Sequence, residues 1–168
     1  REVTEKFIST TMEPYRAAFG EAFGNTVPGV FQDEAHIAPA GDSTCISYTP
    51  KLFEAFAARW GYDLRLHLPS LYTDIGDWRR VRHNYYATLL ELFIVNWAIP
   101  YAEYCQKNQL CFTGHYWEHR WPSPDHGPDN MALASYSHMP GIDILMNQYR
   151  TAPDAQFGNH RAVKEIRS

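Results

Sequence analysis

Hydrophobic side chains recur at helical spacing in two long stretches of the chain. Between Val3 and Phe23 they return every three or four residues, which predicts a helix that Gly24 and Asn25 end. A second broad apolar face runs from Asp77 to about Pro100, where proline is expected to kink or break the helix. Shorter helices are predicted at Pro50–Trp60, Met131–His138 and Asn159–Ile166. Thr49 is the predicted N-terminal cap of the first of these.

Three short, mostly apolar runs separate these helices and have the residue types of β-strands. They are Thr26–Phe31, Leu110–Thr113 and Gly141–Met146. Alternation of helices with short strands is typical of a parallel sheet with helical crossovers, so the fold class is α/β. Because the runs are mostly apolar, we expect the strands to be covered on both faces.

Polar side chains accompany each predicted strand. Asp33 and Glu34 follow the first, His115 to Glu118 follow the second, and Asp143 lies within the third. In a (β/α)8 barrel the catalytic residues lie at the carboxyl ends of the strands. Polar residues at the ends of these strands therefore favour an arc of such a barrel. A whole TIM-like barrel needs eight strands and about 250 residues. The 168 residues therefore predict a single, partial barrel domain, truncated at both ends.

Composition narrows the function classes. Hydrophobic residues make up 45% and charged residues 20% of the chain, which is typical of a globular domain. The net charge of −4 and the lack of a basic stripe argue against nucleic-acid binding. No apolar run is long enough to span a membrane, no signal peptide opens the chain, and the three scattered cysteines suggest neither disulfides nor a metal site.

The segment from His115 to His119 has the order H-x-x-E-H of inverted zinc peptidases. That spacing brings both imidazoles to one metal only on a helix. An apolar, β-prone run precedes it and a proline-rich stretch follows Trp121, so a strand and a loop are predicted there. The sequence therefore predicts no zinc at His115 and His119, and a zinc metallohydrolase is the remote alternative.

Five stretches together resemble bacterial glycoside hydrolases of the α-L-rhamnosidase type, family 106. They are VPGVFQDEAHI, FEAFAARWGYDL, VRHNYYATLLELF, FTGHYWEH and HMPGIDIL, and the resemblance runs from Phe19 to about Glu165. It implies a (β/α)8 barrel, inverting cleavage of a terminal deoxy-sugar, a bound calcium ion near the sugar, accessory β domains and a periplasmic or secreted location. The chain would hold about strands four to six of that barrel. A later strand, outside this chain, often delivers another glutamate.

Two glutamates are the candidate catalytic residues. Glu34 is placed to protonate the leaving glycosidic oxygen, with Asp33 on the opposite face of the strand as an orienting group. Glu118 is the candidate base that activates water, or else a rim residue paired with Arg120. For inversion, the carboxyl groups of Glu34 and Glu118 should face one pocket and lie about 6.5–9.5 Å apart.

Four further residues are candidates for substrate binding. His115 can bind a sugar hydroxyl or orient a carboxylate, Trp117 and Trp121 can stack on a sugar ring, and Asp143 can support the site. The alternatives are a structural histidine, loop packing and a hydrogen bond inside the barrel.

The sequence therefore predicts a glycosidase whose partners are a glycoside or oligosaccharide substrate and the remainder of the barrel. The isolated chain is expected to be inactive. The competing hypothesis is a non-catalytic fragment that binds carbohydrate or packs against the rest of a larger barrel protein. Whether Glu34 and Glu118 converge on one cleft distinguishes the two.

Overall fold

Three parallel strands form the sheet, in the order β1–β2–β3. The computed structural model describes residues 1–39, 45–120, 123–143, 163–164 and 166–167. The strands are β1 (Gly29–Asp33), β2 (Cys111–His115) and the short β3 (Met139–Pro140). Both neighbouring pairs are parallel. The predicted mixed α/β class and the parallel sheet are therefore confirmed.

The first predicted helix forms with one interruption. It consists of α1 (Glu2–Phe7), a π-helical segment η1 (Ile8–Met12), α2 (Glu13–Phe19) and a 3₁₀ turn η2 (Gly20–Ala22). Pro14 lies in the first turn of α2, directly after the π-helical segment. The widened π-helical turn makes room for the proline ring, so the helical run continues through Pro14.

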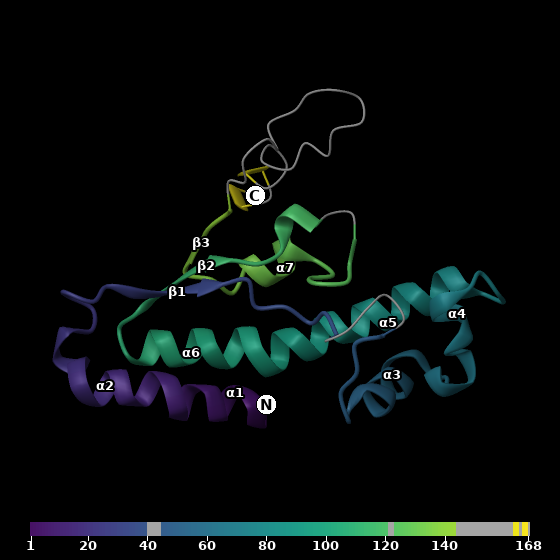
Figure 1. Ribbon diagram of the computed structural model, residues 1–168, viewed down its shortest axis with the longest axis horizontal. Helices are drawn as coiled ribbons and strands as arrows, with labels where there is room; N and C mark the ends of the chain where they lie inside the picture. The colour runs from purple at the N-terminus through teal and green to yellow at the C-terminus, as the bar shows by residue number, and fades with distance from the viewer. Residues whose placement is uncertain (40–44, 121–122, 144–162, 165, 168) are drawn as a thin grey trace.

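The longest helical run is α5 (Trp78–Phe93), a π-helical segment η4 (Ile94–Ala98) and α6 (Ile99–Lys107). Of the two expectations for Pro100, a kink or a break, the break is wrong, because the helical run continues to Lys107. Pro100 lies in the first turn of α6, and the widened π-helical turn ahead of it removes the clash with the preceding carbonyl. The run therefore passes along the molecule as one continuous rod (Figure 1).

A small helical lobe precedes this rod. It contains α3 (Leu52–Trp60), the 3₁₀ helix η3 (Leu64–His67) and α4 (Pro69–Tyr72). The predicted stop of α3 is confirmed, because Gly61 ends it in the left-handed conformation with φ 74°. The predicted Thr49 cap is wrong: the helix starts later, and Thr49 only accepts a bond from the Leu52 amide at 2.9 Å through its carbonyl.

The third strand pairs earlier than the sequence predicted. β3 follows α7 (Asn130–Ala134) and the 3₁₀ turn η5 (Glu118–Arg120), and its partners on β2 are Thr113 and Gly114. The Gly141 amide then donates to the Gly114 carbonyl at 2.8 Å, and the chain leaves the sheet. Residues 144–146 of the predicted strand lie outside the described residues, as do 159–162 of the last predicted helix.

Two apolar clusters stabilise the fold, and the helical rod contributes to both. One joins the helical lobe to α5 through Leu52, Phe56, Leu64, Val81, Tyr85 and Leu89. The other joins η1, α6 and β2 through Met12, Tyr101, Cys105, Leu110 and Phe112. In Figure 1 the sheet and α1–α2 lie on opposite sides of α6, which therefore anchors the sheet. No helix in the described part of the chain is long and apolar enough to cross a bilayer.

The described residues meet the expectation of strands buried on both faces only in part. Gln32 and Phe112 are buried on the helix side. On the opposite face Phe31 is 63% exposed, whereas His115 is buried. Among the described residues, the face that bears Phe31, called the open face below, is therefore only partly covered.

The closest contact in the sheet is at Gly114. Its φ is 129°, and a Cβ there would lie 2.0 Å from the Gln32 carbonyl oxygen. We predict that Gly114→Ala lowers the free energy of unfolding by about 3 kcal/mol or more, since backbone strain and overpacking add. Gly61→Ala is the matched control: it is also left-handed but has no atom within 4 Å, so about 1–2 kcal/mol is expected. Urea unfolding measures both, and equal losses would contradict the packing explanation.

The open face predicts self-association of the isolated chain. Phe31 and Met139 are exposed on strands at the two edges of the sheet. We expect binding of a hydrophobic dye and concentration-dependent oligomers, both reduced in Phe31→Ser. A monomer that binds no dye and melts in one sharp transition at high temperature would show that the described fold is complete by itself.

Candidate functional site

The register of β1 and β2 brings two polar side chains together where both strands end. Asp33 pairs with His115 across the sheet, and its Oδ1 lies 3.1 Å from His115 Nε2. The Asp33 side chain is 78% exposed, whereas His115 is buried. The predicted meeting of polar groups at the carboxyl edge of the sheet is thus present for this pair.

Glu34 leaves the strand in the left-handed conformation, with φ 52°. Two bonds hold its backbone: its amide donates to the His115 carbonyl at 3.3 Å, and the Trp117 indole donates to its carbonyl at 3.0 Å. Strand alternation therefore stops at Asp33, and the expected opposite orientation of Glu34 does not apply. The Glu34 carboxylate lies 3.6 Å from His119 Nε2.

Glu118 is buried, with only 5% of its surface exposed. Its Oε1 accepts a hydrogen bond from the Asp143 amide at 2.6 Å, and its Oε2 lies 3.4 Å from His115 Nδ1. One buried carboxylate therefore positions both the His115 ring and the backbone of Asp143. The alternative for Glu118 was an exposed rim residue paired with Arg120. The Arg120 guanidinium instead donates to Asp125 at 3.1 Å.

Both ring nitrogens of His115 face hydrogen-bond acceptors, Nδ1 the Tyr116 carbonyl and Nε2 the Asp33 carboxylate. Nδ1 lies 2.9 Å from the Tyr116 carbonyl, which can only accept, so Nδ1 carries a hydrogen. Burial alone lowers the pKa of His115, but the Glu118 carboxylate and the Tyr116 carbonyl outweigh burial and raise that pKa above its ordinary value. Nδ1 is thus bonded to the backbone, and Nε2 is the nitrogen that faces the exposed Asp33 carboxylate.

Three side chains converge closely enough to hold a metal ion. One ligand atom each from Glu34, His115 and Asp143 lies within 4.8 Å of the others. The calcium implied by the sequence resemblance prefers six to eight oxygen ligands. An imidazole with two carboxylates fits that ion poorly and is closer to the donor set of a first-row transition metal.

Three imidazoles surround Trp117. The ring centroids of His36, His119 and His126 lie 5.8, 4.9 and 4.4 Å from its ring. Burial, and then the nearby His126, lower the pKa of His36. Trp117 is therefore a packed residue of the loop as well as a candidate for stacking on a sugar.

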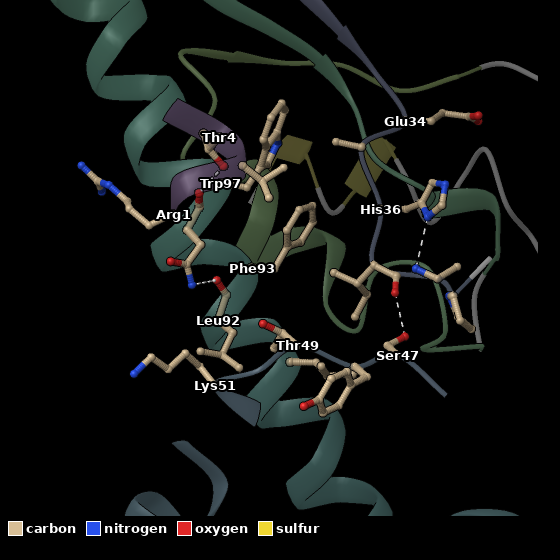
Figure 2. Close-up of a pocket in the computed structure, with 18 residues that line it drawn as sticks. Arg1, Thr4, Glu34, His36, Ser47, Thr49, Lys51, Leu92, Phe93 and Trp97 are labelled. Atoms are coloured by element: carbon tan, nitrogen blue, oxygen red, sulfur yellow. Dashed lines mark hydrogen bonds between the residues drawn. The ribbon is translucent and has the colours of Figure 1, made fainter. Parts of the chain in front are cut away.

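Glu34 and Glu118 line different cavities. Glu34 lies on the rim of an open cavity of about 680 Å³ between the segment after β1 and the side chains of Phe93 and Trp97 on the helical rod. In Figure 2 its carboxylate points away from those two rings. Glu118 borders a void of about 10 Å³, room for one water at most. The described residues therefore do not form the expected single pocket for the two glutamates, and the convergence that would favour a glycosidase over a non-catalytic fragment is not met within them.

The remaining predicted residues divide by position. Asp143 joins the cluster with Glu34 and His115, whereas Trp121 lies outside the described residues. Sequence reasoning missed Gln32, which is buried, donates to the His115 carbonyl at 2.7 Å and accepts from the Trp97 indole at 3.1 Å. A polar residue inside an apolar strand was the available signal.

No family model matches this chain, and no curated protein or solved structure gives a match. The family resemblance seen in the sequence therefore stays a prediction. Function is inferred below from the arrangement of the side chains themselves.

The two histidines with shifted pKa values give a titration test. We predict that His115 titrates above and His36 below the ordinary imidazole value, because carboxylates surround the first and burial dominates at the second. In Glu118→Gln the pKa of His115 should fall while that of His36 stays unchanged. NMR titration of the imidazole Cε1 protons measures both.

The sign of the stability effect follows from the raised pKa of His115. A histidine whose pKa is higher in the folded than in the unfolded state stabilises the folded protein. This stabilisation is complete at pH values below the unfolded-state pKa of about 6.5, and it is lost as the pH rises through the folded-state pKa. The difference in unfolding free energy between wild type and His115→Gln should therefore shrink above neutral pH. A difference that grows with pH would contradict the assigned charge of His115.

Proposed function

We propose that this chain belongs to the catalytic barrel of a glycoside hydrolase that removes a terminal deoxy-sugar such as an α-L-rhamnoside. The observation that carries the proposal is the meeting of Asp33, Glu34, His115 and Asp143 at the carboxyl ends of parallel strands. Carboxylates at this position are the machinery of glycosidic cleavage, and this is the edge at which barrel enzymes carry their sites.

In this proposal Glu34 is the general acid. Its backbone is held from both sides, by the His115 carbonyl and the Trp117 indole, so the carboxyl group is presented from a fixed turn. With the backbone held, only the side-chain torsions of Glu34 remain to be ordered before its carboxyl group donates a proton to the leaving oxygen.

Neighbouring groups supply a binding surface for the sugar. Phe31 lies on the same face as His115, with ring centroids 5.9 Å apart, and offers an apolar platform for a sugar face. Asp33 is exposed beside it and can accept hydrogen bonds from sugar hydroxyls. An apolar platform next to acceptors suits a deoxy-sugar such as rhamnose, in which a methyl group stands where other hexoses carry a hydroxymethyl group.

The contacts of Glu118 support a positioning role more than that of the base. Its two oxygens are engaged with the Asp143 amide and the His115 ring, beneath the site. The base that activates water would then come from strands outside the described residues. The base role of Glu118 remains the alternative that mutation can test.

Membership in a larger barrel accounts for the open sheet. In the described part of the chain, β1 and β3 lie at the two edges of the sheet, and Phe31 and Met139 on these strands are exposed. Further strands on either side would pair those edges and enclose Phe31, and with it the carboxylates.

The test is leaving-group dependence in the full-length gene product that carries this chain. We expect Glu34→Gln to nearly abolish cleavage of rhamnosides with poor leaving groups and to spare activated aryl rhamnosides, which need little protonation. Glu54→Gln, on the exposed side of α3, is the matched control and should leave both rates unchanged. Initial rates on the two substrate types decide the outcome.

Two other outcomes separate the alternatives. If Glu118 activates water, Glu118→Gln should slow the cleavage of both substrate types equally. If Glu118 positions the His115 ring, the substitution should instead lower the pKa of His115. Binding of the sugar without turnover by wild-type protein would favour a non-catalytic carbohydrate-binding module.

A further inference from the structure

We propose that Glu34, His115 and Asp143 form a reversible binding site for a divalent transition-metal ion, with Zn²⁺ as the best-fitting probe, and that the bound ion inhibits the enzyme. The binding of the ion stands on the geometry alone. The inhibition rests on the proposed function, because it requires Glu34 to be the general acid.

The three ligands come from three separate parts of the sheet edge. Glu34 follows β1, His115 ends β2 and Asp143 lies shortly after β3, yet their ligand atoms are all within 4.8 Å of one another. Around a tetrahedral zinc ion, ligand atoms lie roughly 3–3.5 Å apart. Small side-chain rotations therefore close the site, since Glu34 and Asp143 are partly exposed and free to adjust.

The orientation of His115 is the second, independent observation. Nδ1 is bonded to the Tyr116 carbonyl and approached by Glu118, which leaves Nε2 as the nitrogen able to ligate. A carboxylate behind the distal nitrogen of a histidine is the arrangement that orients metal-ligating imidazoles. Glu118 also holds the Asp143 amide, so one buried group positions two of the three ligands.

The exposed Asp33 carboxylate completes the surroundings. Its Oδ1 lies 3.1 Å from His115 Nε2, so it must either release that nitrogen to the ion or share in binding it. Three protein ligands with a fourth position left to water or to Asp33 match the open coordination of zinc. Among the described residues the cluster offers fewer oxygen ligands than calcium prefers, and the imidazole favours a transition metal.

This ligand set is distinct from the H-x-x-E-H motif. The motif would use His119 as the second imidazole, whereas His119 is not a member of the cluster and its ring packs against Trp117. The proposal therefore leaves intact the sequence prediction that the His115–His119 pair does not bind zinc.

Ion binding excludes the acid role of Glu34. A carboxylate that ligates a metal has lost its proton and cannot donate it to a leaving oxygen. Zinc should therefore slow the cleavage of substrates with poor leaving groups more than the cleavage of activated aryl substrates. The same selectivity is expected when Glu34 is replaced by Gln.

Calorimetric titration of ZnCl₂ into the chain tests binding without any need for activity. We expect one ion per chain. His115→Gln and Asp143→Asn should each lose this binding, and Glu118→Gln should weaken it by roughly 10–100-fold. His67→Gln, in the helical lobe, is the matched control and should bind as wild type does, whereas His119→Gln removes a contact to Glu34 and should still bind one ion per chain. Circular dichroism confirms that each variant is folded, and the partly exposed Asp143 keeps the test informative if a buried variant is not.

Three results would overturn the site. They are no zinc binding by the folded chain, loss of binding in His119→Gln, and tighter binding of Ca²⁺ than of Zn²⁺. In the full-length enzyme, zinc that binds as described but spares the cleavage of poor leaving groups would leave the ion site standing. It would instead refute Glu34 as the general acid, so the two proposals fail separately.

Discussion

The close approach of β1 and β2 at Gly114 determines how the rest of the site is arranged. A side chain there would collide with the Gln32 backbone, with the nearest oxygen 2.0 Å from a Cβ. Only glycine permits this approach, and the register that it fixes sets Asp33 beside His115. The side-chain amide group of Gln32 donates to the His115 carbonyl and accepts from the Trp97 indole, so it connects the end of the strand to the helical rod.

The burial of Glu118 is the second constraint. A buried carboxylate costs several kcal/mol unless its oxygens are satisfied. Here the oxygens engage the Asp143 amide and the His115 ring, which lie on different segments of the chain. The charge of Glu118 therefore joins the segment after β3 to the end of β2. It also raises the pKa of the imidazole that faces the exposed carboxylates.

Periodicity was sufficient to predict the two long helical runs, the two longer strands and the parallel sheet, because burial of an apolar stripe dictates each of them. It also located Asp33 and Glu34 at a strand end. It could not reveal that Glu34 adopts φ 52°, since that depends on bonds from His115 and Trp117, more than 80 residues away. The same holds for Glu118, whose burial depends on a backbone amide 25 residues downstream. The cap at Thr49 and the break at Pro100 were not found, because a turn and a π-helical segment offered alternative solutions.

The open face of the sheet joins the fold to the proposed chemistry. Phe31 and Asp33 are two residues apart on β1 and therefore share a face, with the apolar ring deeper and the carboxylate at the carboxyl end. His115, beside Asp33 on β2, adds a polar group at the same level. A barrel interior needs this layering, with apolar packing below and polar groups at the mouth. Single exposed apolar side chains are common on protein surfaces, so Phe31 alone does not identify an enclosed site. In the proposed barrel, however, further strands would enclose this ring together with Asp33 and His115, and the same three side chains would then face a substrate.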